Sequence, residues 1–143
     1  MVRIADNCAV LQKFNPPTVH APSGYSHVTI SPAGRLAHFA GQCPLDLDEN
    51  VVGEPGDFGA QTDQVIANCL AVLASAGVEP DDVVRSIVYV VSPDSSVLSA
   101  VWHRLMASPL APAFTSASTL LGVASLGYRG QLIEIDLTAA LSE

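Results

Sequence analysis

The chain has 143 residues, of which 49% are hydrophobic and only 14% are charged. This length suits a single domain, residues 1–143, with a substantial core, and the composition excludes a disordered protein. Six Lys and Arg residues and a net charge of −8 argue against a nucleic-acid partner, because phosphate-backbone binding requires clustered basic side chains.

The first part of the chain predicts two short strands and an acidic loop. The first twenty or so residues are rich in proline and predict an irregular segment. Residues 27–30 and 36–42 predict strands, separated by a turn at 31–34. The acidic residues of 45–56 predict a solvated loop, because their spacing and the missing turn glycine do not match a calcium-binding loop.

Two segments have the apolar periodicity of helices. Asp57 predicts the N-cap of the first, whose apolar stripe runs from Phe58 to Leu73, and Gly77 predicts its end. The second begins near Asp94 and is ended by prolines beyond position 108. Its stripe consists of Val97, Leu98, Val101, Trp102, Leu105 and Met106.

The remaining elements are strands, at 83–91, about 117–123 and 131–138, with a glycine-rich turn at 127–130. Two helices and four to six strands predict the α+β class. The 83–91 strand is apolar at both alternating positions, and two helices cover only one face of a sheet. We therefore expect a homo-oligomer, in which another subunit covers the second face.

Other features define the environment of the protein. No run of about 18 apolar residues is present and the N-terminal segment is too polar for a signal peptide, so we expect a cytoplasmic protein without a membrane partner. Cys8, Cys43 and Cys69 indicate neither a disulfide framework nor a zinc site, and Cys69 is expected in the core.

Six short blocks, in this order and spacing, resemble the Rid family (reactive intermediate deaminases, also called the YjgF family) over nearly the whole chain. The blocks are Gly24-Tyr25-Ser26-His27, Phe39-Ala40-Gly41-Gln42, Gln61 to Gly77 with Asn68, Ile87-Val88-Tyr89-Val90, Val123-Ala124-Ser125-Leu126 and Leu132-Ile133-Glu134-Ile135.

The resemblance implies a chorismate-mutase-like α+β fold, a mixed sheet with two helices on one face. It implies a homotrimer with three clefts between neighbouring subunits. The implied reaction is the hydrolysis of a 2-aminoacrylate-type enamine, or of its imine, to ammonia and a 2-keto acid. Neither a metal nor a cofactor is implied.

Glu134 is the leading catalytic candidate, because its neighbours place it on an otherwise buried strand. A carboxylate there is paired, or holds a water as an acid or base, or faces solvent through the alternation of the strand. The resemblance implies that Glu134 orients the attacking water. The resemblance also places Tyr25 in the cleft, where the alternative is a tyrosine that only fills an interface between subunits. It implies that the N–H of Gly41 binds a substrate carboxylate, where the alternative is a glycine that only forms a turn.

The chain departs from the family at two positions of the pocket. The carboxylate-binding arginine of the family is replaced by Ser118, or by Phe114 in a second alignment, and a frequent serine is replaced by Ala40. Losing a charged clamp costs about 1.5–3 kcal/mol of binding. We therefore expect a substrate other than simple 2-aminoacrylate. Arg129 is a further cation near the last strand, although a solvated turn residue is the simpler interpretation.

The four histidines, His20, His27, His38 and His103, are scattered and lack metal-ligand spacing. His103 lies beside Arg104 but outside any basic patch, which disfavours the nuclease activity sometimes attached to the family. The favoured function is an imine or enamine hydrolase that binds a small molecule in its clefts. The alternatives are a non-catalytic ligand-binding or regulatory trimer and a catalyst of condensation or cyclisation.

Overall fold

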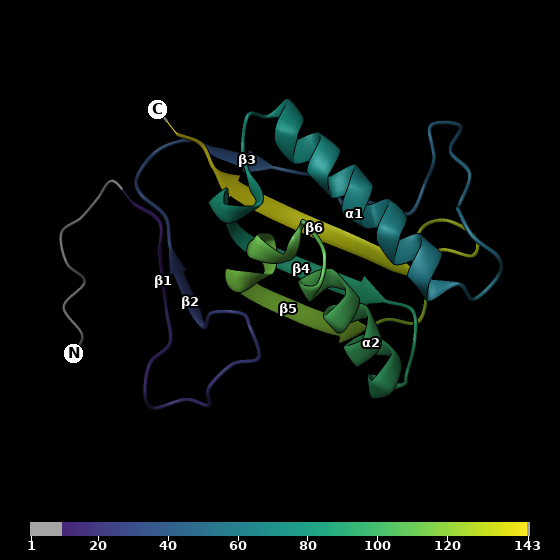
Figure 1. The fold of residues 1–143 in the computed structure, drawn as a ribbon, viewed down its shortest axis with the longest axis horizontal. Coiled ribbons are helices and arrows are strands. Elements are labelled where there is room, and N and C mark those ends of the chain that lie inside the picture. Colours follow the sequence, from purple (N-terminus) through teal and green to yellow (C-terminus); the bar gives the residue numbers. More distant parts are fainter. Residues whose placement is uncertain (1–9, 143) are drawn as a thin grey trace.

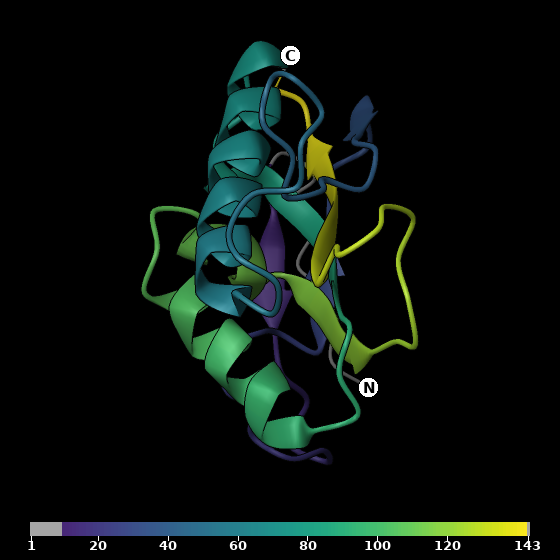
Figure 2. The same ribbon diagram turned by 90° about the vertical axis from the view of Figure 1, so that its right-hand side faces the viewer.

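The computed structural model describes residues 10–142 and has two helices packed on one face of a mixed four-stranded sheet (Figures 1 and 2). The predicted α+β class is confirmed. In chain order the elements are β1 (Gln12–Phe14), β2 (Val28–Ile30), β3 (Leu36–His38), α1 (Phe58–Ser75), η1 (Pro80–Asp82), β4 (Val83–Val90), α2 (Ser95–Met106), η2 (Ala111–Thr115), β5 (Ala117–Gly122) and β6 (Ile133–Ala140).

The main sheet has the strand order β3-β6-β4-β5. Strands β4 and β5 are parallel and are joined through α2, as a parallel pair requires a crossover connection, whereas β6 is antiparallel to both of its neighbours. The register sets Ile87 of β4 opposite Thr119 of β5 and Asp136 of β6. Directly opposed residues project from the same face of a sheet, so these three side chains share one face.

The helices cover the other face, which forms the core. Along β6 the residues that point toward the helices are at most 2% exposed: Ile133, Ile135, Leu137 and Ala139. The alternating residues, including Glu134 and Asp136, are only half-buried. We call the face that carries Glu134 and Asp136 the open face, because neither helix lies on it (Figure 2). The prediction that two helices cover only one face is confirmed.

Both helices begin at the predicted aspartate caps. The Asp57 carboxylate accepts a hydrogen bond from the Ala60 N–H (2.9 Å), and Asp94 caps α2 in the same way. Arg104 of α2 forms a bidentate ion pair with Asp63 of α1. This pair is exposed and adds little stability, although the guanidinium lowers the pKa of Asp63. Neither helix is long and apolar enough to cross a membrane.

Three strand predictions need correction. Cys8, also named from the sequence, lies outside the described residues. The proline-rich lead-in contains β1, which pairs antiparallel with β2 in a separate ribbon. Three residues are too few to display alternation, so a pairing partner distant in sequence decides that strand. The 36–42 strand ends at His38, four residues early, and the last strand is Ile133–Ala140 instead of 131–138.

Candidate functional site

A β-bulge lies beside the strand that carries Glu134. Strand β3 ends at His38, and the Phe39 N–H still donates to the Leu137 carbonyl (3.1 Å). The next pairing with β6 is at Gln42, which exchanges two backbone hydrogen bonds with Ile135 (2.8 and 3.1 Å). Between His38 and Gln42 the β3 side has three residues, whereas β6 has two, so the Ala40–Gly41 segment bulges. Bulges redirect the chain at sheet edges and often lie next to active sites.

The bulge brings Gly41 against the two carboxylates of the open face. A Cβ atom at position 41 would overlap the Glu134 carboxylate and would lie 2.9 Å from Oδ1 of Asp136. Only glycine leaves room for this contact. The Gly41 N–H makes no hydrogen bond with any residue from 10 to 142, so it can donate to a bound molecule. Ala40, its neighbour, is exposed.

The Glu134 side chain is held by a buried glutamine. Nε2 of Gln131 donates to Oε2 of Glu134 (3.2 Å), and Gln131 itself is only 3% exposed. Gln61 of α1 accepts from the Leu132 N–H (2.8 Å) and donates to the Gly130 carbonyl (2.9 Å). These contacts fix the start of β6 against α1, which orients the carboxylate before any ligand binds.

Two further titratable groups lie beside these carboxylates. The Tyr89 hydroxyl donates to Oδ2 of Asp136 (3.0 Å), and this hydrogen bond is the main reason that the pKa of Tyr89 is raised. The pKa of the half-buried Cys43 thiol is raised by burial and, to a smaller extent, by the negative charge of Glu134. Both groups therefore keep their protons at neutral pH.

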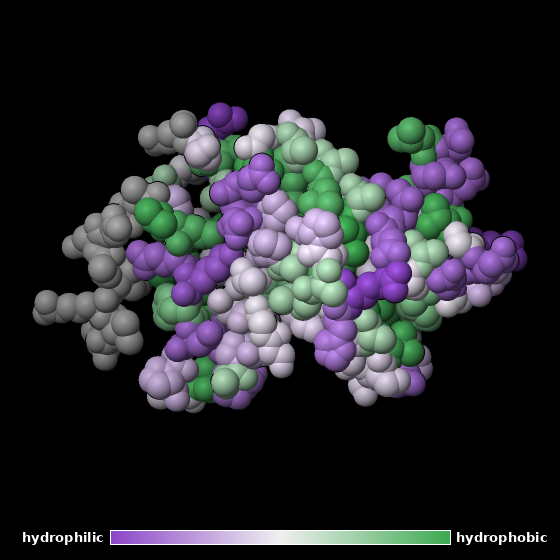
Figure 3. All heavy atoms as spheres, viewed as in Figure 1, coloured by the Kyte–Doolittle hydropathy of each residue, from purple (hydrophilic) through white to green (hydrophobic). Residues whose placement is uncertain are grey.

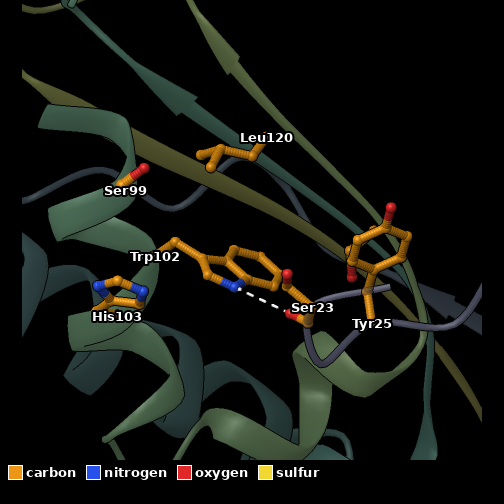
Figure 4. Close-up of a pocket in the computed structure, with 7 residues that line it drawn as sticks. Ser23, Tyr25, Ser99, Trp102, His103 and Leu120 are labelled. Atoms are coloured by element: carbon orange, nitrogen blue, oxygen red, sulfur yellow. Dashed lines mark hydrogen bonds between the residues drawn. The ribbon is translucent and has the colours of Figure 1, made fainter. Parts of the chain in front are cut away.

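A pocket of about 390 Å³ lies on the opposite side of the sheet, between α2, β5 and the loop that precedes β2. In Figure 3 the lower edge of the molecule is indented between this loop and α2. The pocket is lined by Ser23, Tyr25, Ser99, Trp102, His103, Ser118 and Leu120. Figure 4 shows the Trp102 ring projecting toward the loop, where its Nε1 donates to the Ser23 carbonyl (3.3 Å).

Ser118 lines this pocket but is also part of the framework. Its hydroxyl lies 2.5 Å from that of Ser86 and 3.1 Å from the carbonyl oxygens of Phe114 and Ser116. Phe114 is fully buried and packs edge-to-face on Trp102 (5.7 Å between centroids). Neither predicted substitute for the family arginine lies on the face of Glu134. The β5 residue on that face is Thr119.

Tyr25 belongs to a cluster with two histidines, although the sequence suggests that the histidines are scattered. The Tyr25 hydroxyl lies 2.8 Å from Nε2 of His20, and Nε2 of His27 lies 2.8 Å from the His20 carbonyl oxygen. The two imidazole rings stack edge-to-face at 4.7 Å. Residues 10–142 contain no group of three or more metal-ligating side chains.

The predicted site residues thus form two groups in one chain. Glu134 and Gly41 lie together on the open face, with Ala40 at the rim, whereas Tyr25 and Ser118 line the pocket. Arg129 is exposed in the loop before β6. Sequence reasoning missed four side chains at these places: Arg85, Tyr89, Trp102 and Asp136. For three of them the sequence contained a signal, the alternation of side chains between the two faces of a strand. Alternation predicts that Arg85 and Tyr89 share one face of β4, and that Asp136 shares the face of β6 that carries Glu134.

Comparison with known proteins agrees with this architecture. The model of the family described as "Endoribonuclease L-PSP" matches residues 17–141. Protein DfrA of Myxococcus xanthus is 32% identical over 117 residues, which cover 80% of this chain and 83% of that protein.

Two solved structures from Yersinia pestis are also similar. The Rid-family protein YyfB has a TM-score of 0.77 at 36% identity and covers 92% of this chain and 98% of its own. The Rid-family protein YyfA has a TM-score of 0.64 at 26% identity, covering 85% and 90%. A family model that matches most of the chain, together with these relatives, shows that the chain belongs to the Endoribonuclease L-PSP family, the Rid family.

Proposed function

We propose that this protein hydrolyses a reactive imine or enamine in a cleft between copies of the chain, with Glu134 holding the attacking water. The observation that carries the proposal is the Glu134 carboxylate, which Gln131 holds against the backbone of Gly41, a residue whose N–H has no hydrogen-bond partner among residues 10–142. A carboxylate that accepts from water, next to a free backbone donor, suits the addition of water to a polarised C=N bond.

The chemistry follows from these two groups. Glu134 accepts a proton as the water oxygen forms a bond to the carbon of the protonated imine, and the C=N electron pair moves to nitrogen. Glu134 then returns its proton to the nitrogen of the resulting carbinolamine. Collapse of that adduct breaks the C–N bond, passes the hydroxyl proton back to Glu134, and releases ammonia and a carbonyl product. An enamine first becomes an imine by proton transfer to carbon.

A second copy of the chain would join the two groups of site residues. Glu134 and Gly41 project from the open face, whereas Tyr25 and Ser118 line the pocket on the helix side. A single small ligand reaches both groups only where the pocket of one copy meets the open face of another. In this arrangement Tyr25 and Ser118 bind the part of the substrate remote from the reacting carbon, Ala40 lies at the rim, and the assembly is a homotrimer.

Glu134→Gln tests the catalytic proposal. We expect the release of ammonia from imines, generated in situ by an amino-acid oxidase, to fall about 10²- to 10⁴-fold, because the variant cannot accept the proton. Glu54→Gln removes the same charge from an exposed loop and should keep full activity. Circular dichroism checks that both variants fold.

Two outcomes would count against the proposal. A wild-type protein that binds keto acids without turning over any imine would be a binding module instead. Light scattering that reports a monomer at all concentrations would remove the cleft between copies.

A further inference from the structure

The loop before β2 carries two hydrogen-bonded side chains that lead from solvent to the pocket. The Tyr25 hydroxyl lies 2.8 Å from Nε2 of His20. Tyr25 is half-buried in the pocket wall, whereas His20 is exposed. Nδ1 of His20 makes no hydrogen bond with any residue from 10 to 142. The imidazole can therefore exchange a proton with solvent at one nitrogen and with the Tyr25 hydroxyl at the other.

His27 holds this pair in place. Its Nε2 lies 2.8 Å from the His20 carbonyl oxygen, and its ring packs edge-to-face on the rings of His20 (4.7 Å between centroids) and Tyr25 (5.5 Å). The His27 backbone N–H donates to Oδ1 of Asn15 (2.8 Å), which ties the cluster to the end of β1. The hydroxyl and the imidazole are thus positioned for proton transfer before any ligand binds.

The other hydroxyls beside the candidate site have different partners. Tyr89 donates to Asp136, and this hydrogen bond raises the pKa of Tyr89, so its proton is held firmly. The Ser118 hydroxyl is engaged by Ser86 and by two backbone carbonyls. The Tyr25 hydroxyl faces an imidazole instead, a group that can replace its proton as soon as it is lost.

One step of the proposed reaction lacks a proton donor, namely the conversion of an enamine to an imine. The nitrogen of an enamine and the carbon that must be protonated lie on opposite sides of the reacting carbon. Glu134 acts at the nitrogen and at the water. The carbon chain then points toward the second group of site residues, which contains Tyr25.

We propose that Tyr25 protonates the carbon of an enamine substrate and that His20 supplies the proton through Tyr25. This inference rests on the proposed function and assigns the step that precedes hydrolysis. Tyr25 is the catalytic acid, and His20 is its positioning residue. We call the pair the relay.

The relay balances protons and electrons. The enamine nitrogen forms the C=N bond as the C=C electron pair takes the Tyr25 proton, so a C–H bond forms and the O–H bond breaks. The phenol oxygen takes the Nε2 proton of protonated His20. The products are a protonated imine, a neutral Tyr25 and a neutral His20, which regains its proton from solvent. The proton that remains on Glu134 after hydrolysis leaves with ammonia as ammonium.

The stereochemistry of the product tests the relay directly. 2-Aminocrotonate, released from threonine by a threonine dehydratase, is hydrolysed in heavy water, and the 2-ketobutyrate is reduced at once to 2-hydroxybutyrate to stop further exchange. A fixed acid adds deuterium to one face of the enamine carbon, whereas solvent adds it to both. With the wild type we expect one configuration to exceed the other more than about 10-fold by NMR, and equal amounts without the protein.

Two variants identify the acid. Tyr25→Phe removes the donor, and His20→Gln keeps a hydrogen-bonding side chain beside Tyr25 but supplies no proton. Both should lower enamine turnover about 10²-fold and give equal amounts of the two configurations. The imine of phenylglycine cannot form an enamine, so both variants should hydrolyse it with a kcat close to that of the wild type. His38→Gln, at an exposed histidine outside the cluster, should keep the wild-type stereochemistry.

The outcomes separate the relay from the proposed function. Equal amounts of both configurations from the wild type, or unchanged stereochemistry in Tyr25→Phe, would overturn the relay and leave hydrolysis through Glu134 standing. Equal losses on the enamine and the imine in His20→Gln would also overturn it, because the cluster would then only shape the loop. If Glu134→Gln still releases ammonia while the wild-type product has one configuration, the hydrolytic role of Glu134 fails and the relay stands.

Discussion

The two faces of the main sheet are built from the same strands and behave as opposites. Toward the helices, β4 and β6 present Val88, Val90 and Ile135, all fully buried, in a closed apolar layer. Toward the open face the alternate residues are Tyr89 and Glu134, which are half-buried and hydrogen-bonded. One face supplies stability, and the other retains polar groups that can meet a ligand.

This difference follows from where the free energy of burial is gained. A fully buried branched side chain contributes about 1.5–3 kcal/mol, so the helix-covered face accounts for much of the stability of the domain. Polar groups on the open face contribute little to folding, because they exchange water for protein partners. They can therefore be arranged for binding without weakening the core. The following predictions test that division, from the largest expected effect to the smallest.

Phe114→Ala should cost about 3–5 kcal/mol of unfolding free energy, because it empties a fully buried site behind Trp102. Urea denaturation measures the loss, and the fluorescence of Trp102, the single tryptophan of the chain, reports the altered pocket wall. Leu47→Ala, at a fully exposed leucine, should change stability by less than about 0.5 kcal/mol. Similar losses in both variants would contradict the packing on the helix side.

Gly41→Ala should affect activity more than stability. The added Cβ displaces the end of the flexible Glu134 side chain, not backbone, so the unfolding free energy should fall by no more than about 1 kcal/mol. Misplacing the carboxylate by about 1 Å should lower turnover about 10- to 100-fold. Gly127→Ala, where a Cβ meets nothing within 4 Å, is the matched control. Unchanged turnover in Gly41→Ala would show that the position of Gly41 does not matter for the reaction.

Cys69 should give an effect that is absent near neutral pH, a pH dependence of stability that originates on the helix side. Burial raises the pKa of its thiol to about 12, whereas an unfolded thiol titrates near 8.5. Above about pH 8.5 the unfolded chain loses the Cys69 proton while the folded protein keeps it, so this contribution to stability is present below that pH and falls as the pH rises toward 12.

The difference in unfolding free energy between the wild type and Cys69→Ala should therefore be constant from pH 6 to 8 and shrink above pH 9. Denaturation at each pH measures it. A difference that stays flat to pH 11 would mean that the thiol is not buried as described.

Much of the helical layer could be predicted, because its signals are local. Asp57 and Asp94 cap their helices through side chains that contact residues two or three positions away, and Gly77 adopts the predicted left-handed conformation (φ 70°). The strand β1 and the bulge at Gly41 were missed, because both depend on partners elsewhere in the chain.

The candidate site was predicted in identity but not in arrangement. Glu134 and Gly41 were chosen separately, and the bulge places them in contact. Ser118 was chosen as the residue at the arginine position, yet the pairing of β5 with β4 turns it toward Ser86 and sets Thr119 on the face of Glu134. One residue of register reverses the face of every side chain in a strand, and register is set by contacts between strands.

The sequence by itself determined the α+β class, the two capped helices, the acidic charge and the family, because composition, periodicity and short motifs are properties of neighbouring residues. Only the tertiary structure decided which side chains share a face. It set Arg85 beside Thr119, placed Tyr25 with two histidines, and separated the pocket from the open face. The physical reason is that strand order and register are decided by burying the apolar face of the whole sheet, which no single segment specifies.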